Sequence, residues 1–177
     1  LFAAIVPPAD VREHLITALR PIRSFSGTEV RWSDPDNWHI TVAFYGAQPN
    51  DAAAVTDHLA QATAFTRPLR LHLRGAGGFD RRTLWIGVGG DKAPLKDLMA
   101  DCQLDPDVRR RQRAHLSVAR TGTRTRDPWL LDDHAHALAV YTGPEFAADE
   151  VKLFESHLGR GRSGGPKYEV VDTFYLR

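Results

Sequence analysis

The sequence has a single cysteine, Cys102, among 177 residues, and it has neither a large excess of one charge nor a long apolar run. A single thiol excludes an intrachain disulfide and any metal or redox site that needs two thiolates. Lys and Arg number 23 against 22 Asp and Glu, so the net charge of +1 gives no overall attraction to a polyanion. No apolar run approaches the roughly 20 residues that span a bilayer, so no membrane-spanning helix is expected.

The opening stretch LFAAIVPP is too short for a secretion signal and carries no basic flank. Together with the lone thiol, which suits a reducing compartment, this predicts a cytoplasmic protein. The sequence starts at Leu rather than Met. The prediction therefore leaves open a leader that has already been removed.

Short apolar runs and amphipathic stretches follow one another along the whole chain, with no long linker. Apolar or alternating runs predict strands at 1–7, 38–46, 69–77, 83–90, 114–120, 150–158 and 168–177. Apolar residues at helical spacing predict helices at 9–19, 51–65, 93–104 and 127–141. Polar or glycine-rich turns join the third strand to the fourth and the sixth to the seventh, which predicts two hairpins. Because hairpins and helices are mixed, an antiparallel α+β fold is favoured over an alternating parallel sheet.

Two tetrapeptides, HITV at 39–42 and HLSV at 115–118, share the order histidine, aliphatic residue, small hydroxyl residue and valine. Each lies in a predicted strand. Because side chains alternate between the faces of a strand, the histidine and the hydroxyl residue face one side while the two aliphatic residues face a core. Two matching imidazole–hydroxyl pairs are therefore presented from different halves of the chain.

These pairs contain the groups that in-line displacement at phosphorus requires. His39 and His115, with ordinary pKa values near ~6.5, can serve as an acid and a base near neutral pH. Thr41 and Ser117 can donate hydrogen bonds to non-bridging phosphate oxygens. A single histidine in a strand is more often a half-buried structural residue. The repetition in matching strands favours the catalytic interpretation.

The two motifs resemble the paired H-x-[ST]-x signatures of the two-histidine phosphoesterase superfamily. Their surroundings are similar to those in its RNA 2',3'-cyclic phosphodiesterases, also named 2'-5' RNA ligases or LigT-like proteins. The similarity covers most of the chain: the opening LFAAIVPP, the approach RWSDPDNWHITVAFYG, the second motif in RAHLSVAR, and the closing LFESHL and YEVVDTFYL. Two positions depart from the family pattern, Ala114 where Pro is common and Ser117 where Thr is commoner. Neither departure removes a reacting group.

The resemblance implies a single bilobal domain over residues 1–177. In this pseudo-twofold duplication, two antiparallel sheets line a central cleft and the helices lie outside. It also implies metal-independent hydrolysis of an RNA or nucleotide 2',3'-cyclic phosphate to a 2'-phosphate, without a cofactor, and it leaves open a reversible 2'-5' RNA ligation. The expected partners are RNA ends or 2',3'-cyclic nucleotides, and we expect a monomer.

Roles for four residues follow from the same resemblance by position. His39 would be the proton donor to the leaving ribose oxygen, and His115 would be the proton acceptor from water. Thr41 and Ser117 would bind the substrate phosphate. The residues themselves do not fix which histidine gives the proton and which takes it.

Arginines flank the second motif, in the run 109–113 and at Arg120. Arg113 lies two residues before His115 and would share its face if the strand begins early enough. The resemblance also implies an arginine at this position. We therefore expect Arg113 to bind the substrate phosphate, while most of the other arginines are expected in solvated loops.

Two further features have structural interpretations. Strict alternation from His39 predicts that Phe44 faces the core, and only a twist or bulge would bring it to the cleft. His134 and His136 lie two residues apart on a predicted helix, where side chains diverge, and no third ligand is evident. No metal site is therefore expected.

Two other functions remain open. The same cleft could serve a non-catalytic module that binds RNA ends or nucleotides, and tight binding without turnover would favour this function. Alternatively, the chain could be a superfamily enzyme that acts on another phosphoester.

Overall fold

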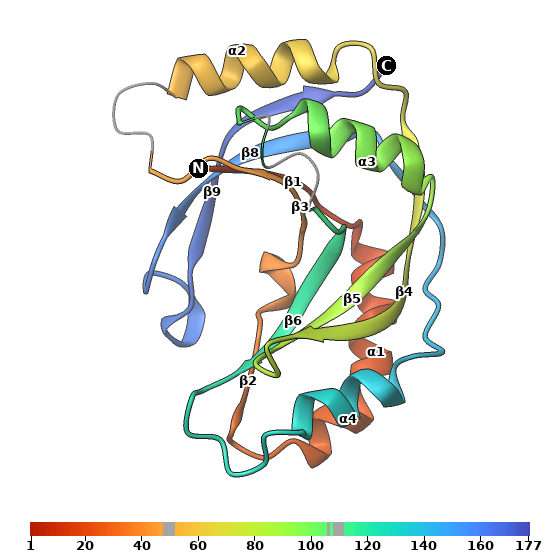
Figure 1. Cartoon of the computed structure of the whole chain (residues 1–177), viewed down its shortest axis with the longest axis vertical. Helices are drawn as coiled ribbons and strands as arrows, with labels where there is room; N and C mark the ends of the chain where they lie inside the picture. Colours follow the sequence, from red (N-terminus) through yellow and green to blue (C-terminus); the bar gives the residue numbers. More distant parts are fainter. Residues whose placement is uncertain (48–51, 106, 108–111) are drawn as a thin grey trace.

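The computed structural model describes residues 1–47, 52–105, 107 and 112–177 and contains two antiparallel sheets with four helices (Figure 1). The first sheet has four strands in the order β3-β1-β8-β9. Their bounds are Ile40–Phe44 for β3, Phe2–Ile5 for β1, Glu150–His157 for β8 and Lys167–Tyr175 for β9. The predicted closing hairpin is present, because β8 and β9 pair antiparallel along their length.

The second sheet has five strands in the order β2-β6-β5-β4-β7, and it also contains only antiparallel pairs. Their bounds are Val30–Trp32 for β2, His115–Thr121 for β6, Thr83–Gly90 for β5, Leu69–Phe79 for β4 and Phe146–Ala148 for β7. The predicted hairpin of β4 and β5 is confirmed. Its tight turn places Asp80 and Arg81 at positive φ.

In the described residues, four α-helices and the 3-10 turns η1 and η3 connect the strands. The helices are α1 at Ala9–Phe25, α2 at Ala52–Thr63, α3 at Lys92–Asp101 and α4 at Leu130–Ala137, and the turns are η1 at Pro35–Asn37 and η3 at Arg162–Gly164. In α1 the buried residues Val11, Leu15 and Leu19 recur every four positions, which is the stripe that predicted the helix. No helix in the described part of the chain is both long and apolar enough to cross a membrane.

The two halves of the chain repeat one order of elements. Apart from β2, the order β1-α1-β3-α2 is matched by β5-α3-β6-α4. In both halves the motif strand, β3 or β6, pairs antiparallel with the strand that opens the repeat. The helices α1 and α4 cover the five-stranded sheet, while α2 contacts β9 and α3 contacts β3 (Figure 1). The predicted α+β fold with two antiparallel sheets and outer helices is confirmed.

One hydrophobic core cluster draws on both sheets and all four helices. It includes Ile40 and Val42 from the first motif and Leu116 and Val118 from the second, all of them fully buried. These are the residues that the alternation assigned to the core. Their burial turns the intervening histidines and hydroxyl residues toward the opposite face.

The prediction that Phe44 lies in the core is wrong, because its side chain is 71% exposed. The pairing of β1 with β3 shifts between Ala3 and Ala4, whose partners are Ala43 and Thr41, so Val42 is an extra residue in β3. Val42 and Ala43 are consecutive and both fully buried. The bulge therefore reverses the alternation after Val42, and Phe44 faces outward.

Candidate functional site

Both histidine–hydroxyl pairs line one cavity of about 480 Å³. His39 immediately precedes β3 and Thr41 lies on it, while His115 and Ser117 lie on β6. The strands β3 and β6 contact each other although they belong to different sheets. The turn between β8 and β9 forms a further wall of the cavity, including residues 162–166. The fold thus brings together two motifs that lie 76 positions apart in the sequence, from His39 to His115.

The two imidazoles are held by the same local contact. The Nδ1 atom of His39 lies 2.7 Å from the carbonyl oxygen of Asn37, and Nδ1 of His115 lies 2.7 Å from the carbonyl oxygen of Arg113. A carbonyl oxygen can only accept, so Nδ1 carries the hydrogen in both rings. In each neutral ring Nε2 then has the free lone pair, and in each cation Nε2 carries the second proton. Nε2 is therefore the atom that can exchange a proton.

Aromatic rings surround each imidazole. The ring centroids of Phe2 and Tyr168 lie 4.8 and 5.4 Å from that of His39. On the other side, the centroids of Phe79 and Trp85 lie 4.9 and 6.2 Å from that of His115. These rings restrict the imidazoles and lower the local polarity. The sequence did not indicate them, because they come from strands distant in sequence and have no common spacing with the motifs.

The side chain of Asn37 connects the first motif to the turn between β8 and β9. Its Nδ2 donates a hydrogen bond of 2.9 Å to the carbonyl oxygen of Pro166, and its own carbonyl receives the His39 hydrogen. One residue therefore holds both the imidazole and the opposite wall of the cavity.

Burial lowers the pKa of His39 below its ordinary value. The hydrogen bond to the Asn37 carbonyl raises this pKa, and the nearby His115 lowers it further. Desolvation is the largest of the three effects, because burial penalises the cationic ring. The neutral form of His39 is therefore favoured in the protein alone. A phosphate anion placed beside it would favour the cation.

We expect the His39 ring to titrate below pH ~6.5 in the free protein and at higher pH once inorganic phosphate is added. Between the lowered pKa of the folded protein and ~6.5, the unfolded chain binds more protons, so the free energy of unfolding rises with pH across that window. Histidine-resolved NMR titration measures the first effect, and chemical unfolding at several pH values measures the second. In the control variant His39→Asn, the rise of the unfolding free energy with pH across that window should diminish. Titration of the wild-type His39 ring at or above pH ~6.5 without phosphate would contradict the lowered pKa.

Cationic side chains outnumber acidic ones in this cavity. Arg31, Arg120 and Arg162 are among the lining residues, and Asp34 is the one carboxylate among the described residues that line it. A guanidinium nitrogen of Arg162 lies 3.6 Å from a carboxylate oxygen of Asp34 and 3.5 Å from one of Asp36. Arg31 and Arg120 give the cavity its excess of positive charge. Of the arginine run, residues 109–111 lie outside the described residues.

Arg113 lies beside the cavity rather than in its lining. β6 begins at His115, so Arg113 precedes the strand, and its guanidinium carbon lies 4.6 Å from the centroid of the Trp85 ring. This side chain lines a neighbouring cavity, and its carbonyl oxygen holds His115. The arginine therefore contacts the site through its backbone.

The remaining candidates have structural partners. His134 is buried, and its Nε2 lies 2.9 Å from the hydroxyl of Ser26 at the end of α1. Burial raises the pKa of the Cys102 thiol to about 12, so the thiolate that a nucleophile needs is disfavoured. Within residues 1–47, 52–105, 107 and 112–177, no three His, Cys, Asp or Glu side chains are grouped so that they could hold a metal ion.

The chain is similar in sequence and in fold to known phosphoesterases. A sequence model of the family described as LigT like Phosphoesterase matches residues 5–85. An RNA 2',3'-cyclic phosphodiesterase of Aquifex aeolicus is 28% identical over 158 residues, which are 82% of this chain and 81% of that protein. Another, from Geobacillus stearothermophilus, is 30% identical over 82% of this chain. The matched region is 47% of that protein, so this chain spans about half of its length. The structure of E. coli LigT complexed with 3'-AMP matches with a TM-score of 0.73 at 22% identity, over 99% of this chain and 96% of that one.

Proposed function

Because the chain belongs to the LigT-like phosphoesterase family, we propose that it hydrolyses the 2',3'-cyclic phosphate of an RNA end or a nucleotide to a 2'-phosphate. The observation that carries this proposal is the single cavity lined by both imidazoles and both hydroxyls. The relatives from Aquifex and Geobacillus are RNA 2',3'-cyclic phosphodiesterases, which supports it. So does the binding of 3'-AMP, a nucleoside phosphate, by E. coli LigT.

In the proposed reaction, water attacks phosphorus from the side opposite the ribose 3' oxygen. His115 takes a proton from the water through Nε2 as the new P–O bond forms. His39 gives its Nε2 proton to the 3' oxygen as the P–O3' bond breaks, which leaves the phosphate on the 2' oxygen. His39 ends neutral and His115 ends as a cation, and exchange with solvent restores the starting state.

The hydroxyls of Thr41 and Ser117 donate hydrogen bonds to the non-bridging phosphate oxygens, whose charge distribution changes in the transition state. Binding of the anionic substrate raises the pKa of His39 from its lowered value, so the proton donor is charged when substrate is present. The same groups support a ligation in which the 5'-hydroxyl of another RNA attacks in place of water, the P–O3' bond breaks and a 2'-5' link forms. In its reversal the 3'-hydroxyl attacks phosphorus, the 5'-hydroxyl leaves and the cyclic phosphate is regenerated. No step in this scheme requires a metal or a cofactor.

Hydrolysis of 2',3'-cyclic AMP in the presence of EDTA tests the proposal. We expect turnover that is insensitive to the chelator, with 2'-AMP as the product resolved by chromatography. The matched control is the double variant His39→Ala/His115→Ala, which should give no product above background. Formation of 3'-AMP, or a rate that EDTA removes and a divalent metal restores, would contradict the scheme.

A further inference from the structure

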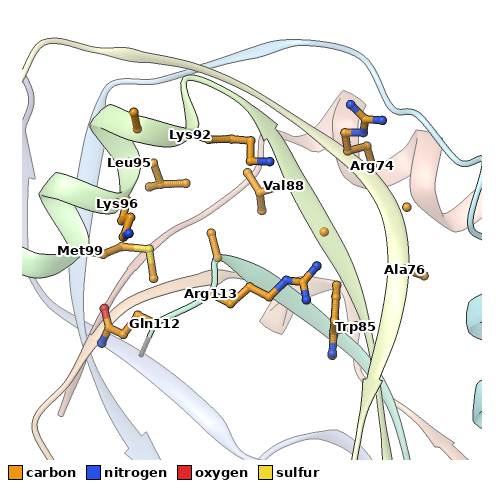
Figure 2. A pocket seen from close by; sticks show the side chains of 14 residues that line it. Arg74, Ala76, Trp85, Val88, Lys92, Leu95, Lys96, Met99, Gln112 and Arg113 are labelled. Carbon is orange, nitrogen blue, oxygen red and sulfur yellow. The ribbon is translucent and has the colours of Figure 1, made fainter. Parts of the chain in front are cut away.

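A second cavity of about 500 Å³ lies next to the candidate site, between α3 and the strands β4 and β5 (Figure 2). Its floor is apolar. Trp85 is 5% exposed and Leu95 is 1% exposed, and Val88 and Met99 are also buried. Gly87 contributes backbone to the lining. The cavity therefore offers an apolar floor that a nucleobase or ribose can cover.

Four cationic side chains line the same cavity. Figure 2 shows Lys92 and Lys96 on α3, Arg74 on β4, and Arg113 on the segment before β6, with the Arg113 guanidinium beside Trp85. The two lysines are half of the four in the sequence.

Among the described residues, no carboxylate balances this charge. The described residues that line the cavity include no Asp or Glu. None of the four cations forms an ion pair within 4.0 Å with a carboxylate of the described chain. The adjacent acid Asp91 instead accepts a hydrogen bond of 2.8 Å from the backbone N–H of Arg70. Four cations without a carboxylate partner in the described residues, arranged around an apolar floor, fit a ligand that carries both phosphate and a ring.

This cavity begins where the candidate site ends. In the pairing of β5 with β6, Gly87 is the partner of His115 and Trp85 is the partner of Ser117. Partners across a sheet share a face and lie about 5 Å apart. Gly87 and Trp85 both line the second cavity, and His115 and Ser117 line the first. A ligand can therefore run from one cavity to the other over a single strand step.

From this arrangement we propose that the second cavity binds the nucleotides upstream of the cyclic phosphate in a single-stranded RNA substrate. Their phosphodiesters contact Arg74, Lys92, Lys96 and Arg113, and a base or ribose covers the apolar floor. The inference rests on the proposed function and adds to it a preference for oligoribonucleotides over cyclic mononucleotides. Exposed cations that each contact one phosphate make binding salt-dependent, with a slope of about 0.7 in log affinity against log salt for each contact on a single strand.

The test compares Lys92→Gln/Lys96→Gln with wild type on two substrates, 2',3'-cyclic AMP and a short oligoribonucleotide that ends in the same cyclic phosphate. We expect KM for the oligoribonucleotide to rise about tenfold at low salt with kcat unchanged, because the variant loses two phosphate contacts. Each such contact contributes about 0.7 to the slope of log affinity against log salt. Both constants for 2',3'-cyclic AMP should stay unchanged. The slope of log kcat/KM for the oligoribonucleotide against log salt should become shallower by about 1.4.

Arg20→Gln/Arg67→Gln is the matched control, because it removes the same charge from two exposed positions away from both cavities. It should leave the KM values for both substrates at the wild-type level. Equal effects of Lys92→Gln/Lys96→Gln on the two substrates, or no effect on either, would overturn the proposal. A third result would also overturn it: inorganic tripolyphosphate inhibits wild type more strongly than Lys92→Gln/Lys96→Gln, while the two proteins have the same oligoribonucleotide kinetics. The cavity would then bind a free anion.

A binding measurement separates this inference from the proposed function. Fluorescence anisotropy with a labelled oligoribonucleotide that ends in a 2'-phosphate needs no catalysis. Weaker binding by Lys92→Gln/Lys96→Gln than by the control would support the RNA path even in a chain without turnover. Equal binding by both variants would overturn it even in an active enzyme.

Discussion

Replacing either His39 or His115 with alanine is expected to lower kcat for 2',3'-cyclic AMP by about 10² to 10⁴-fold, because each variant lacks one of the two proton-transfer groups. Both imidazoles line the same cavity, and each is oriented by its own hydrogen bond to a backbone carbonyl. The two losses should not add fully in the double variant, because groups that act in one step fail together. Product formation under single-turnover conditions measures the loss in the chemical step.

The pH profile gives a second measurement for these variants. Wild type should show a bell-shaped dependence of kcat/KM on pH, with one limb from the acid and one from the base. The alkaline limb of kcat/KM reports the pKa of His39 in the free protein, whereas the alkaline limb of kcat reports its pKa in the substrate complex. Because burial lowers the pKa of His39 in the free protein, the alkaline limb of kcat/KM should lie at a lower pH than that of kcat. The control is His136→Ala, which removes an exposed histidine outside the cavity. Full activity in either single variant would exclude the two-histidine scheme.

Removing one hydroxyl from the cavity is expected to lower kcat by about 10² to 10³-fold, which is the usual effect of losing one preorganised donor to a developing anion. Thr41→Val keeps the shape of the side chain, and Ser117→Ala removes only the oxygen. KM should change much less than kcat, since the hydrogen bonds strengthen in the transition state.

The conservative exchanges Thr41→Ser and Ser117→Thr are the matched controls for this prediction. Both keep the hydroxyl, so kcat should recover to near the wild-type value. A rise in KM with unchanged kcat in Thr41→Val and Ser117→Ala would show that the hydroxyls bind substrate and transition state equally. A failure of Thr41→Ser to recover activity would show that the methyl group, rather than the oxygen, matters at that position.

Local patterns were sufficient to predict most elements of the fold and the grouping of the motifs. The apolar stripe of α1, the alternation in β4 and the short apolar run of β5 each depend on neighbouring residues only, so they could be read directly. The repeated tetrapeptides in β3 and β6 predicted two similar half-sites, and the structure brings both to one cavity. The three-residue strands β2 and β7 were not predicted, because they are too short to show an alternation.

Features that depend on pairing between distant strands could not be predicted. The bulge opposite Ala3 and Ala4 arises where β1 meets β3, and it moved Phe44 from the expected core to the surface. The rings that surround the imidazoles likewise come from β1, β4, β5 and β9. α1 also continues past Pro21, although a proline in a helix removes a hydrogen bond and usually ends it. Ile22 packs against the core beyond this point, which favours the longer helix.

The hydrogen bond from each imidazole to the carbonyl two residues earlier has a consequence for how such a site can be assembled. The hydrogen bond that fixes the tautomer of His39 lies within residues 37–39, and the one that fixes the tautomer of His115 lies within residues 113–115. Each motif therefore orients its own imidazole, while the rest of the fold supplies the separation between the two histidines and part of their surroundings, such as Tyr168 beside His39. A chain divided between α2 and β4 would carry one histidine motif on each fragment, so recovery of activity on mixing would require the two fragments to fold together through the pairs β1–β8 and β2–β6.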